Sequence, residues 1–378
     1  MKKTRFLLIA IVIYIFINSS FSFALETSAK QAILIDINTN SVLFSKNADQ
    51  AMTPSSMSKI MTIYQLFERL KDGGLSLTDT FRVSEKAWRK RGSKMFVGLK
   101  SRVKIEDLIR GIIVQSGNDA AIVVAEGISG SEDSFANSLN VAARKLGMLN
   151  SNFVNASGWP DPGHETTARD LAILTRATIN NFPEFYHYYN EKIFTYNGIK
   201  QRNRNPVIYR NIGADGLKTG HTEAGGYGLT ASAERNNRRL ILVINGLPSK
   251  KLRSTESERL LDWGFREFNN YTLFKRGQTV SKVKIWMGNQ GSIPLLIDKD
   301  LVLTLNRKAR KTMKVKVIMQ SPVSAPIKKG SILAKLKIEF PNRDNLELPL
   351  ISGVSVGQLG LFSRLGKAVE YLLWGEAG

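Results

Sequence analysis

Residues 53–70 read TPSSMSKIMTIYQLFERL, and this stretch decides how the surrounding chain folds. Thr53-Pro54-Ser55 interrupts the element before it, and a helical pattern starts at Ser56. Apolar residues then fall on most sides of the helix, at Met57, Ile60, Met61, Ile63, Tyr64, Phe67 and Leu70. A helix with so wide an apolar surface is buried, so we predict a central helix that ends at Asp72-Gly73-Gly74.

Strand patterns occur on both sides of this helix in the sequence. Before it, residues 32–36 and 42–44 predict a hairpin around Asn38-Thr39-Asn40. After it come predicted helices at 105–114, from Asp119 onward and from Thr167 to about Ile179, then strands at 216–219, 229–232 and 240–245 and a helix at 260–265. Strands at both ends with helices between them predict an α+β domain in which helices pack on a sheet.

The composition changes near residues 272–278, and short β-like runs follow. They cover residues 280–286, 301–305, 315–319, 332–338 and 346–350. Proline and glycine separate several of these runs, which predicts a small all-β domain.

The last segment, 357–374, is amphipathic. One helical face carries Leu361, Phe362, Leu365, Ala368, Val369, Leu372 and Leu373. Such a helix can lie in a membrane interface, and docking on its own β domain is the alternative.

The N-terminus has the layout of a secretory signal peptide. Lys2, Lys3 and Arg5 precede an apolar run at 6–17, and small residues lead to Ala24, after which we expect cleavage. The run is short for a membrane span, and an uncleaved anchor is the alternative. Loss of the three cations would lower the formal net charge from +22 to +19.

The charge balance and the missing cysteine limit the function classes. A strongly basic chain favours an anionic partner, and an exported protein rarely meets nucleic acid. We therefore expect a membrane surface or cell wall and no nucleic acid, although a generally basic proteome would produce the same charge. Without cysteine the chain has no disulfide, no thiol catalysis and no cysteine-built zinc site. His164, His187 and His221 are its only histidines.

Three short motifs follow one another: Ser56-Met57-Ser58-Lys59, Ser116-Gly117-Asn118 and Lys218-Thr219-Gly220. A serine hydroxyl needs a neighbouring base, and residues i and i+3 share a helix face, so Lys59 can touch Ser56. Lysine acts as a base only if its pKa falls, which burial and a second cation, Lys218, would both cause. Backbone N–H groups at a helix start could also stabilise an oxyanion. Each motif is common alone, but together and in order they predict serine acyl transfer.

These motifs resemble those of the low-molecular-mass penicillin-binding proteins, which are serine-type D-alanyl-D-alanine carboxypeptidases. Longer matching segments are 54–59, 215–222, 224–233 and 253–257, and the resemblance continues through 326–330 into the terminal helix. It implies a β-lactamase/transpeptidase-like catalytic domain over 25–274, an antiparallel sheet with packed helices. The signal peptide (1–24) would precede this domain. A small β-rich domain over 275–353 and then a membrane-associating amphipathic helix over 354–378 would follow it.

The resemblance also implies residue roles. Ser56 would form an acyl-enzyme with peptidoglycan stem peptides and release the terminal D-alanine, with Lys59 as general base and Ser116 relaying a proton. The substrate-binding residues would be Asn118, Lys218, Thr219, Gly220, His221 and Arg253. Of these, Lys218, Thr219 and Arg253 would hold the terminal carboxylate, and the backbone N–H groups of Ser56 and His221 would form an oxyanion hole. β-Lactams would be covalent inhibitors, and we expect no cofactor or metal.

Some residues and functions remain open from the sequence alone. Arg253 is a sensible partner for a carboxylate, and a surface arginine at a helix start is the alternative. Glu165 lies on the loop 155–167 without an asparagine three residues later, so we interpret it as structural rather than as the deacylating base of a β-lactamase. We expect His164 and His187 to serve the loop and the packing rather than a metal. A β-lactamase and a non-catalytic wall-binding protein are the competing functions.

Overall fold

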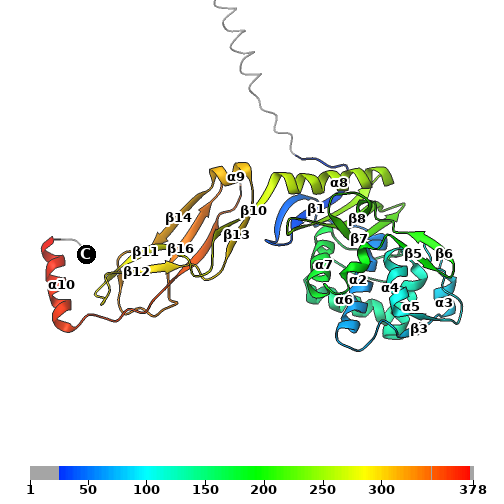
Figure 1. Ribbon diagram of the computed structural model, residues 1–378, viewed down its shortest axis with the longest axis horizontal. Helices are drawn as coiled ribbons and strands as arrows, with labels where there is room; N and C mark the ends of the chain where they lie inside the picture. Colours follow the sequence, from blue (N-terminus) through cyan, green and yellow to red (C-terminus); the bar gives the residue numbers. More distant parts are fainter. Residues whose placement is uncertain (1–24, 342, 375–378) are drawn as a thin grey trace, which may run out of the picture.

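The computed structural model describes residues 25–341 and 343–374 (Figure 1). The predicted signal peptide over 1–24 lies outside the described residues. Figure 1 shows a body of helices packed on a sheet, an elongated body of strands beside it, and helix α10 at the far end of the strands. The predicted order of an α+β domain, a small all-β domain and a terminal helix is therefore confirmed.

A five-stranded antiparallel sheet organises the first body, with the order β2-β1-β9-β8-β7. Its strands are β1 (Gln31–Asp36), β2 (Ser41–Lys46), β7 (Ala214–Thr222), β8 (Gly226–Arg235) and β9 (Arg238–Leu247). The sequence predicted all five. Strand β1 pairs with β9, which is distant in the sequence, with Leu34 opposite Leu242. This pairing encloses the helices between the first and last strands of the body.

Each face of the sheet is covered, because alternate residues of a strand point to opposite sides. Ile33 and Val243 belong to the core shared with the helices, whereas Leu34 and Leu242 belong to a second core under helix α8 (Lys250–Glu267). Gly264 lets α8 approach closely, since a Cβ there would lie 2.7 Å from Leu34 Cδ2. Helix α8 begins about ten residues before the helix predicted at 260–265.

The predicted central helix is present and buried, but its first turn differs from the prediction. A 3-10 turn, η1 (Ser55–Ser58), precedes helix α2 (Lys59–Lys71), so Ser56 lies in the tight turn and not in the α-helix itself. The other helices are α3 (Glu85–Arg89), α4 (Ile105–Ile113), α5 (Asn118–Ser129), α6 (Glu132–Leu146) and α7 (Ala168–Asn181). Thr167 caps α7 as predicted, accepting a hydrogen bond from the Asp170 backbone N–H at 3.0 Å.

Shorter elements complete the first body. They are the strand pair β3 (Thr80–Arg82) and β4 (Arg102–Lys104), the hairpin β5 (Ile193–Tyr196) and β6 (Ile199–Arg202), and the 3-10 turns η2 (Tyr186–Asn190) and η3 (Val207–Tyr209). The hairpin was not predicted from the sequence, although Asn197-Gly198 at its tip is a strong turn signal.

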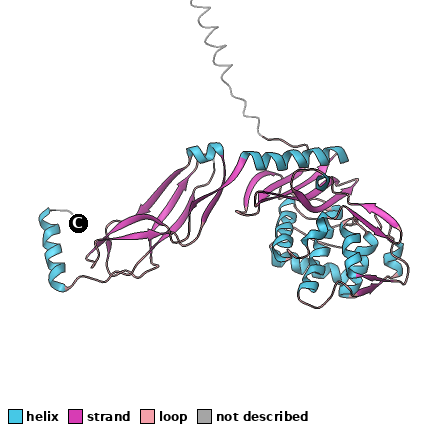
Figure 2. Cartoon of the chain, in the orientation of Figure 1, coloured by secondary structure: helices cyan, strands magenta, loops and turns pink. Residues whose placement is uncertain are grey.

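The second body is built almost entirely of strands, as Figure 2 shows in magenta. Six strands form one sheet in the order β14-β16-β17-β12-β11-β15 around a separate apolar core. Their bounds are β11 (Thr279–Trp286), β12 (Ser292–Leu296), β14 (Lys314–Met319), β15 (Val323–Ser324), β16 (Ile332–Glu339) and β17 (Leu346–Ser352). Strand β10 (Phe268–Phe274) pairs with β13 (Leu301–Asn306), and the basic helix α9 (Arg307–Thr312) follows.

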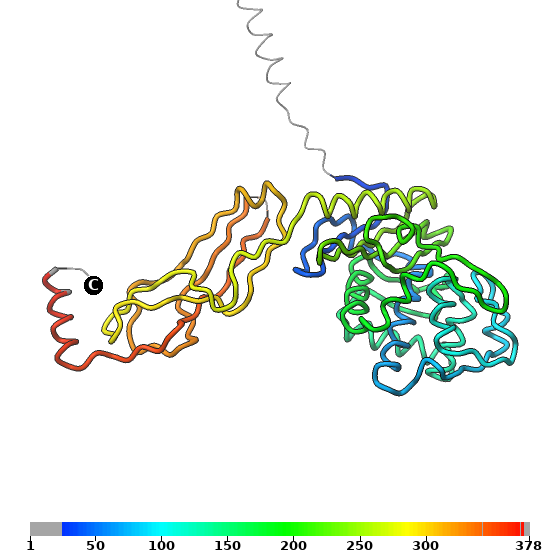
Figure 3. The backbone as a smooth tube through the Cα atoms, viewed as in Figure 1, coloured from blue at the N-terminus to red at the C-terminus, as the bar shows by residue number. Residues whose placement is uncertain are grey.

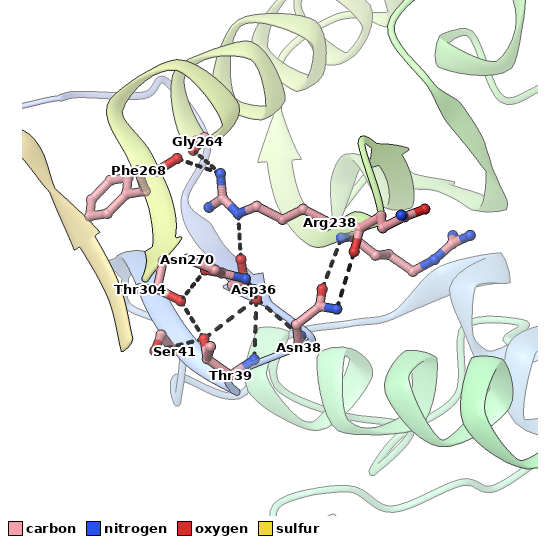
Figure 4. A network of polar contacts seen from close by, with 11 residues as sticks. Asp36, Asn38, Thr39, Ser41, Arg238, Gly264, Phe268, Asn270 and Thr304 are labelled. Atoms are coloured by element: carbon pink, nitrogen blue, oxygen red, sulfur yellow. Dashed lines mark hydrogen bonds and ion pairs between the residues drawn. The ribbon is translucent and has the colours of Figure 1, made fainter. Parts of the chain in front are cut away.

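The two bodies meet where α8 runs directly into β10. This strand lies before the expected boundary at residue 275 and pairs with β13 beyond it. Figure 4 shows the polar network at this junction, centred on the fully buried Asp36. Arg238 Nε donates to Asp36 at 2.6 Å, and Asn270 Nδ2 donates to the same carboxylate at 3.3 Å. A buried charge that is both paired and hydrogen-bonded in this way resists separation of its partners.

Helix α10 (Leu361–Trp374) ends the described chain, as the tube in Figure 3 shows. Its apolar residues are largely exposed, with Phe362 at 91% and Leu372 at 82% of full exposure. The described part of the β body therefore does not cover this face, which disagrees with the alternative of internal docking. Among residues 25–341 and 343–374, no helix is long and apolar enough to span a bilayer.

Candidate active site

Ser56 and Lys59 are in contact. The 3-10 turn places them three residues apart on one side, and Lys59 Nζ lies 2.9 Å from Ser56 Oγ. Two further oxygens hold the same nitrogen: Asn118 Oδ1 at 2.7 Å and the Ser157 carbonyl at 2.5 Å. Lys59 is only 1% exposed and Ser56 is half-buried, so the amine is shielded while the hydroxyl remains accessible.

The pKa of Lys59 is lowered to about 7, mainly because burial disfavours its charged form. The charge of Arg204 lowers this pKa next, and Lys90 adds to the effect, while Asp119 opposes it. The sequence predicted Lys218 as the second cation, but the cations that lower the pKa of Lys59 are Arg204 and Lys90. The effect runs in the other direction: after burial, the charge of Lys59 is the next cause that lowers the pKa of Lys218 well below its usual range. The sequence did not indicate Arg204, which follows β6 outside any recognised motif.

Ser116 and Lys218 form the second polar pair of the site. Lys218 Nζ donates to Ser116 Oγ at 2.9 Å, and both side chains are buried. Ser116 has φ +59°, in the left-handed region, and lies in the loop between α4 and α5. Since Lys218 occupies one lone pair of this hydroxyl, the hydroxyl hydrogen is available to another acceptor.

A cavity of about 640 Å³ opens beside these groups, and none of the described residues that line it is acidic. The lining consists of Ser56, Ser93, Ser116, Arg204, Thr219, Gly220, His221, Tyr227, Lys250 and Arg253. Arg253 is 7% exposed, and its Nε atom has no hydrogen-bond partner among the described residues. Burial lowers the pKa of this guanidinium to about 10. A buried donor without a partner, between other cations, suits an anionic ligand.

Ser56 also lines a second cavity, of about 890 Å³. It shares Ser56, Ser93 and His221 with the first cavity, and its other walls include Trp159 and Pro160 from the loop 155–167. The hydroxyl of Ser56 therefore stands where two cavities meet, in the middle of a groove. A chain-like substrate could bind with its anionic end in the basic cavity and the rest in the larger one.

The loop 155–167 carries two carboxylates, and only one of them reaches a cavity at Ser56: Asp161 lines the second cavity, whereas Glu165 does not. Glu165 is exposed, pairs through its backbone with Asn152, and lines neither cavity at Ser56. This placement agrees with the structural interpretation of Glu165. His164 is buried within the loop region and His187 lies on an exposed turn. No group of three or more metal-ligating His, Asp or Glu residues occurs within the described ranges.

Comparison with known proteins gives the family. The family model for D-alanyl-D-alanine carboxypeptidases matches residues 18–249. The chain belongs to the D-alanyl-D-alanine carboxypeptidase family. The family model for the penicillin-binding protein 5 C-terminal domain matches residues 268–358. Arg253 lies between the two matched regions.

Individual members of the D-alanyl-D-alanine carboxypeptidase family align over most of the chain. D-alanyl-D-alanine carboxypeptidase DacA of Haemophilus influenzae is 36% identical over 90% of this chain and 88% of its own length. The crystal structure of DacD from Francisella tularensis is 29% identical, with a TM-score of 0.81 over 89% of this chain and 95% of that one. Penicillin-binding protein D2 of Listeria monocytogenes, in its ampicillin-bound form, is 29% identical, with a TM-score of 0.59 over 64% of this chain and 99% of that one.

The structure brings all the expected site residues of this carboxypeptidase family member into one groove. Two hydrogen-bonded sets lie there: Lys59 bonds both Ser56 and Asn118, and Lys218 bonds Ser116. Thr219, Gly220, His221 and Arg253 line the basic cavity. Asn118 has two contacts that were not predicted: its Oδ1 accepts from Lys59 Nζ, and its Nδ2 donates to the Arg91 carbonyl at 2.9 Å. One amide hydrogen of Asn118 remains for a substrate.

Proposed function

We propose that this chain is a serine-type carboxypeptidase that removes the terminal D-alanine from D-Ala-D-Ala stem peptides of peptidoglycan. The observation that carries this proposal is the contact between Ser56 and a buried Lys59 whose pKa is lowered, next to a cavity with no acidic residue in its described lining. In that cavity the buried Nε of Arg253 has no hydrogen-bond partner among the described residues. The first feature suits acyl transfer and the second suits a substrate with a carboxylate at its end.

The three contacts of Lys59 explain how it would act as a base. Asn118 Oδ1 and the Ser157 carbonyl can only accept hydrogen bonds, so a neutral amine must direct its two N–H groups to them. The remaining lone pair then points to the third contact, Ser56 Oγ. Neutral Lys59 would accept the Ser56 proton while Oγ attacks the carbonyl carbon between the two D-alanines.

The rest of the groove would complete the reaction. The backbone N–H groups of Ser56 and His221 would stabilise the oxyanion, and Ser116 would relay the proton taken up by Lys59 to the leaving nitrogen as the C–N bond breaks, which returns Lys59 to its neutral form. Free D-alanine would leave the basic cavity. Water would then attack the acyl-enzyme ester, with Lys59 again accepting a proton, and release the shortened peptide and the Ser56 hydroxyl. A β-lactam would acylate Ser56 by the same attack on its ring amide.

The proposal is tested with the purified protein lacking residues 1–24. It should release D-alanine from a D-Ala-D-Ala-terminated peptide, and peptide mapping by mass spectrometry after penicillin treatment should place a long-lived adduct on Ser56. Rapid turnover of penicillin would instead identify a β-lactamase. Folded protein that neither releases D-alanine nor forms an adduct would support the wall-binding alternative.

Arg253→Gln should weaken recognition of the terminal carboxylate. A charge-assisted hydrogen bond contributes about 1.5–3 kcal/mol, so kcat/KM should fall about 10- to 100-fold. The loss should be in KM more than in kcat, and the preference for a free carboxylate over a C-terminal amide should shrink. Arg259→Gln on the same helix, where Arg259 pairs with Glu256 at the surface, is the matched control. An unchanged preference in Arg253→Gln would disprove this assignment.

We further propose that the protein is exported and rests on the outer face of the cytoplasmic membrane through α10. The exposed apolar residues of α10 and the apolar run at 6–17 support this location. A protein that ends at Gly360 should remain in the supernatant when sedimented with anionic phospholipid vesicles, whereas the protein ending at Gly378 should pellet with them. Equal sedimentation of both forms would place the membrane contact elsewhere. D-Alanine release should be the same for both.

A further inference from the structure

We propose that His164 is a positioning residue for acylation, which holds the turn carrying Ser56 through the hydroxyl of Ser58. The inference rests on the proposed role of Ser56 as nucleophile. Neither cavity at Ser56 is lined by His164, so it would act through another residue and not on the substrate. The imidazole is 4% exposed, and Ser58 is fully buried beneath the turn.

The direction of each hydrogen bond in this chain of contacts follows from one backbone group. The Val154 N–H can only donate, and it lies 3.1 Å from His164 Nδ1, so Nδ1 carries no proton. A neutral imidazole then has its hydrogen on Nε2, which lies 2.7 Å from Ser58 Oγ and donates to it. The Ser58 hydroxyl in turn donates to the Ser55 carbonyl at 2.9 Å. The loop and the nucleophile turn are thus joined by three aligned bonds.

The turn Ser55–Ser58, where this series of hydrogen bonds ends, has an unfavourable backbone conformation. Ser55, directly before Ser56, has φ +51°, a conformation that is unfavourable for a residue other than glycine. Its carbonyl lies against Gly158, where a Cβ would come within 1.8 Å of the Ser55 oxygen. Because Ser58 bonds this carbonyl and His164 bonds Ser58, loss of the imidazole would leave the Ser58 hydroxyl, and through it the Ser55 carbonyl, without a fixed position.

His164 suits a fixed support because it stays neutral. Burial lowers its pKa to about 4, with Lys59 acting in the same direction and Asp161 and Glu132 opposing. A protonated ring would present Nδ1–H to the Val154 N–H, setting two donors face to face, and would add a second cation near Lys59. At the pH where Lys59 works as a base, the bond to Ser58 is therefore always made.

The test is a double-mutant cycle on the second-order rate constant for acylation by a chromogenic penicillin. His164→Phe and Ser58→Ala should each lower this constant about 10- to 100-fold, since small misplacements of a reacting group have effects of this size. The double variant should acylate no more slowly than the slower single variant, because both substitutions interrupt the same series of hydrogen bonds. His164→Gln, which can still donate to Ser58, should recover part of the rate. Glu165→Gln is the control on the same loop.

Two outcomes would overturn the role of His164. One is a double variant in which the losses in acylation rate constant of the two single variants multiply, and the other is a wild-type rate constant in His164→Phe. Thermal unfolding of each variant checks that it is folded, and ¹⁵N NMR of the wild-type imidazole does not depend on any variant. The spectrum should show the neutral Nε2–H tautomer of His164 at pH 7, and an Nδ1–H tautomer would contradict the proposed chain. Failure of the wild type itself to acylate would contradict the proposed function and, with it, the role of His164, whereas a wild-type rate in His164→Phe would contradict the role of His164 alone.

Discussion

Ser56→Ala should form no penicillin adduct and should lose at least about 10⁴-fold in D-alanine release, because removal of a nucleophilic serine leaves only binding and oxyanion stabilisation. The alternative acceptors nearby do not replace it. Ser58 is fully buried and bonded to His164 and Ser55, and Ser116 is bonded to Lys218. Intact-mass measurement after penicillin treatment gives the adduct, and a D-alanine assay gives the rate.

The folded state should survive this change, since Ser56 is half-buried and the hydroxyl makes one contact with Lys59. Ser138→Ala on α6 is the control, because Ser138 Oγ bonds only its own helix, at the Phe135 carbonyl. An adduct of normal mass on Ser56→Ala would show that another residue is the nucleophile.

Lys59→Met should lower the acylation rate constant by about 10³-fold, within the range that a general base contributes. The pH dependence gives the sharper expectation. Lys59 must be neutral to accept the proton, and with a pKa of about 7 it is mostly protonated below that pH. The wild-type rate should therefore rise as the pH rises through about 7, and fall about tenfold for each unit below. The acylation rate of Lys59→Met should not show this rise near pH 7.

Lys71→Met is the matched control for Lys59→Met. It lies on the same helix, α2, and Lys71 Nζ bonds the Asn181 carbonyl on the surface. Acylation and its pH profile should remain those of the wild type. Persistence of the rise near pH 7 in Lys59→Met would assign the limb to a different group and remove Lys59 from the role of base.

Much of the fold followed from local patterns in the sequence. The strands of the first sheet and the buried helix α2 carry apolar periodicity strong enough to predict both. Helix α6 was missed although local signals exist, since Ser131 caps its start and Gly147 follows its end. The junction at Asp36 is different in kind. Asp36, Asn270 and Thr304 are brought together only by the tertiary fold, and no spacing in the sequence marks them.

The candidate site was predictable where side chains in short motifs form it. Ser56, Lys59, Ser116 and Lys218 belong to motifs that the sequence displays directly. The Ser157 carbonyl could not be predicted, because a backbone oxygen has no residue signature. Arg204 and His164 act from loops whose position depends on the packing of the whole body, so their nearness to Lys59 and Ser58 appears only in three dimensions.

If α10 rests on a membrane as proposed, the junction would also limit where this enzyme can work. Helix α8 continues into β10 without a linker, and the Asp36 network locks that joint. A catalytic body on a flexible linker would sample a wide range of distances from the membrane. On a stiff support, its distance from the membrane would vary little. With α10 bound to lipid, the protein would cleave stem peptides only in the layer of the wall at that distance from the membrane. The stiffness of the joint would then determine which stem peptides are shortened.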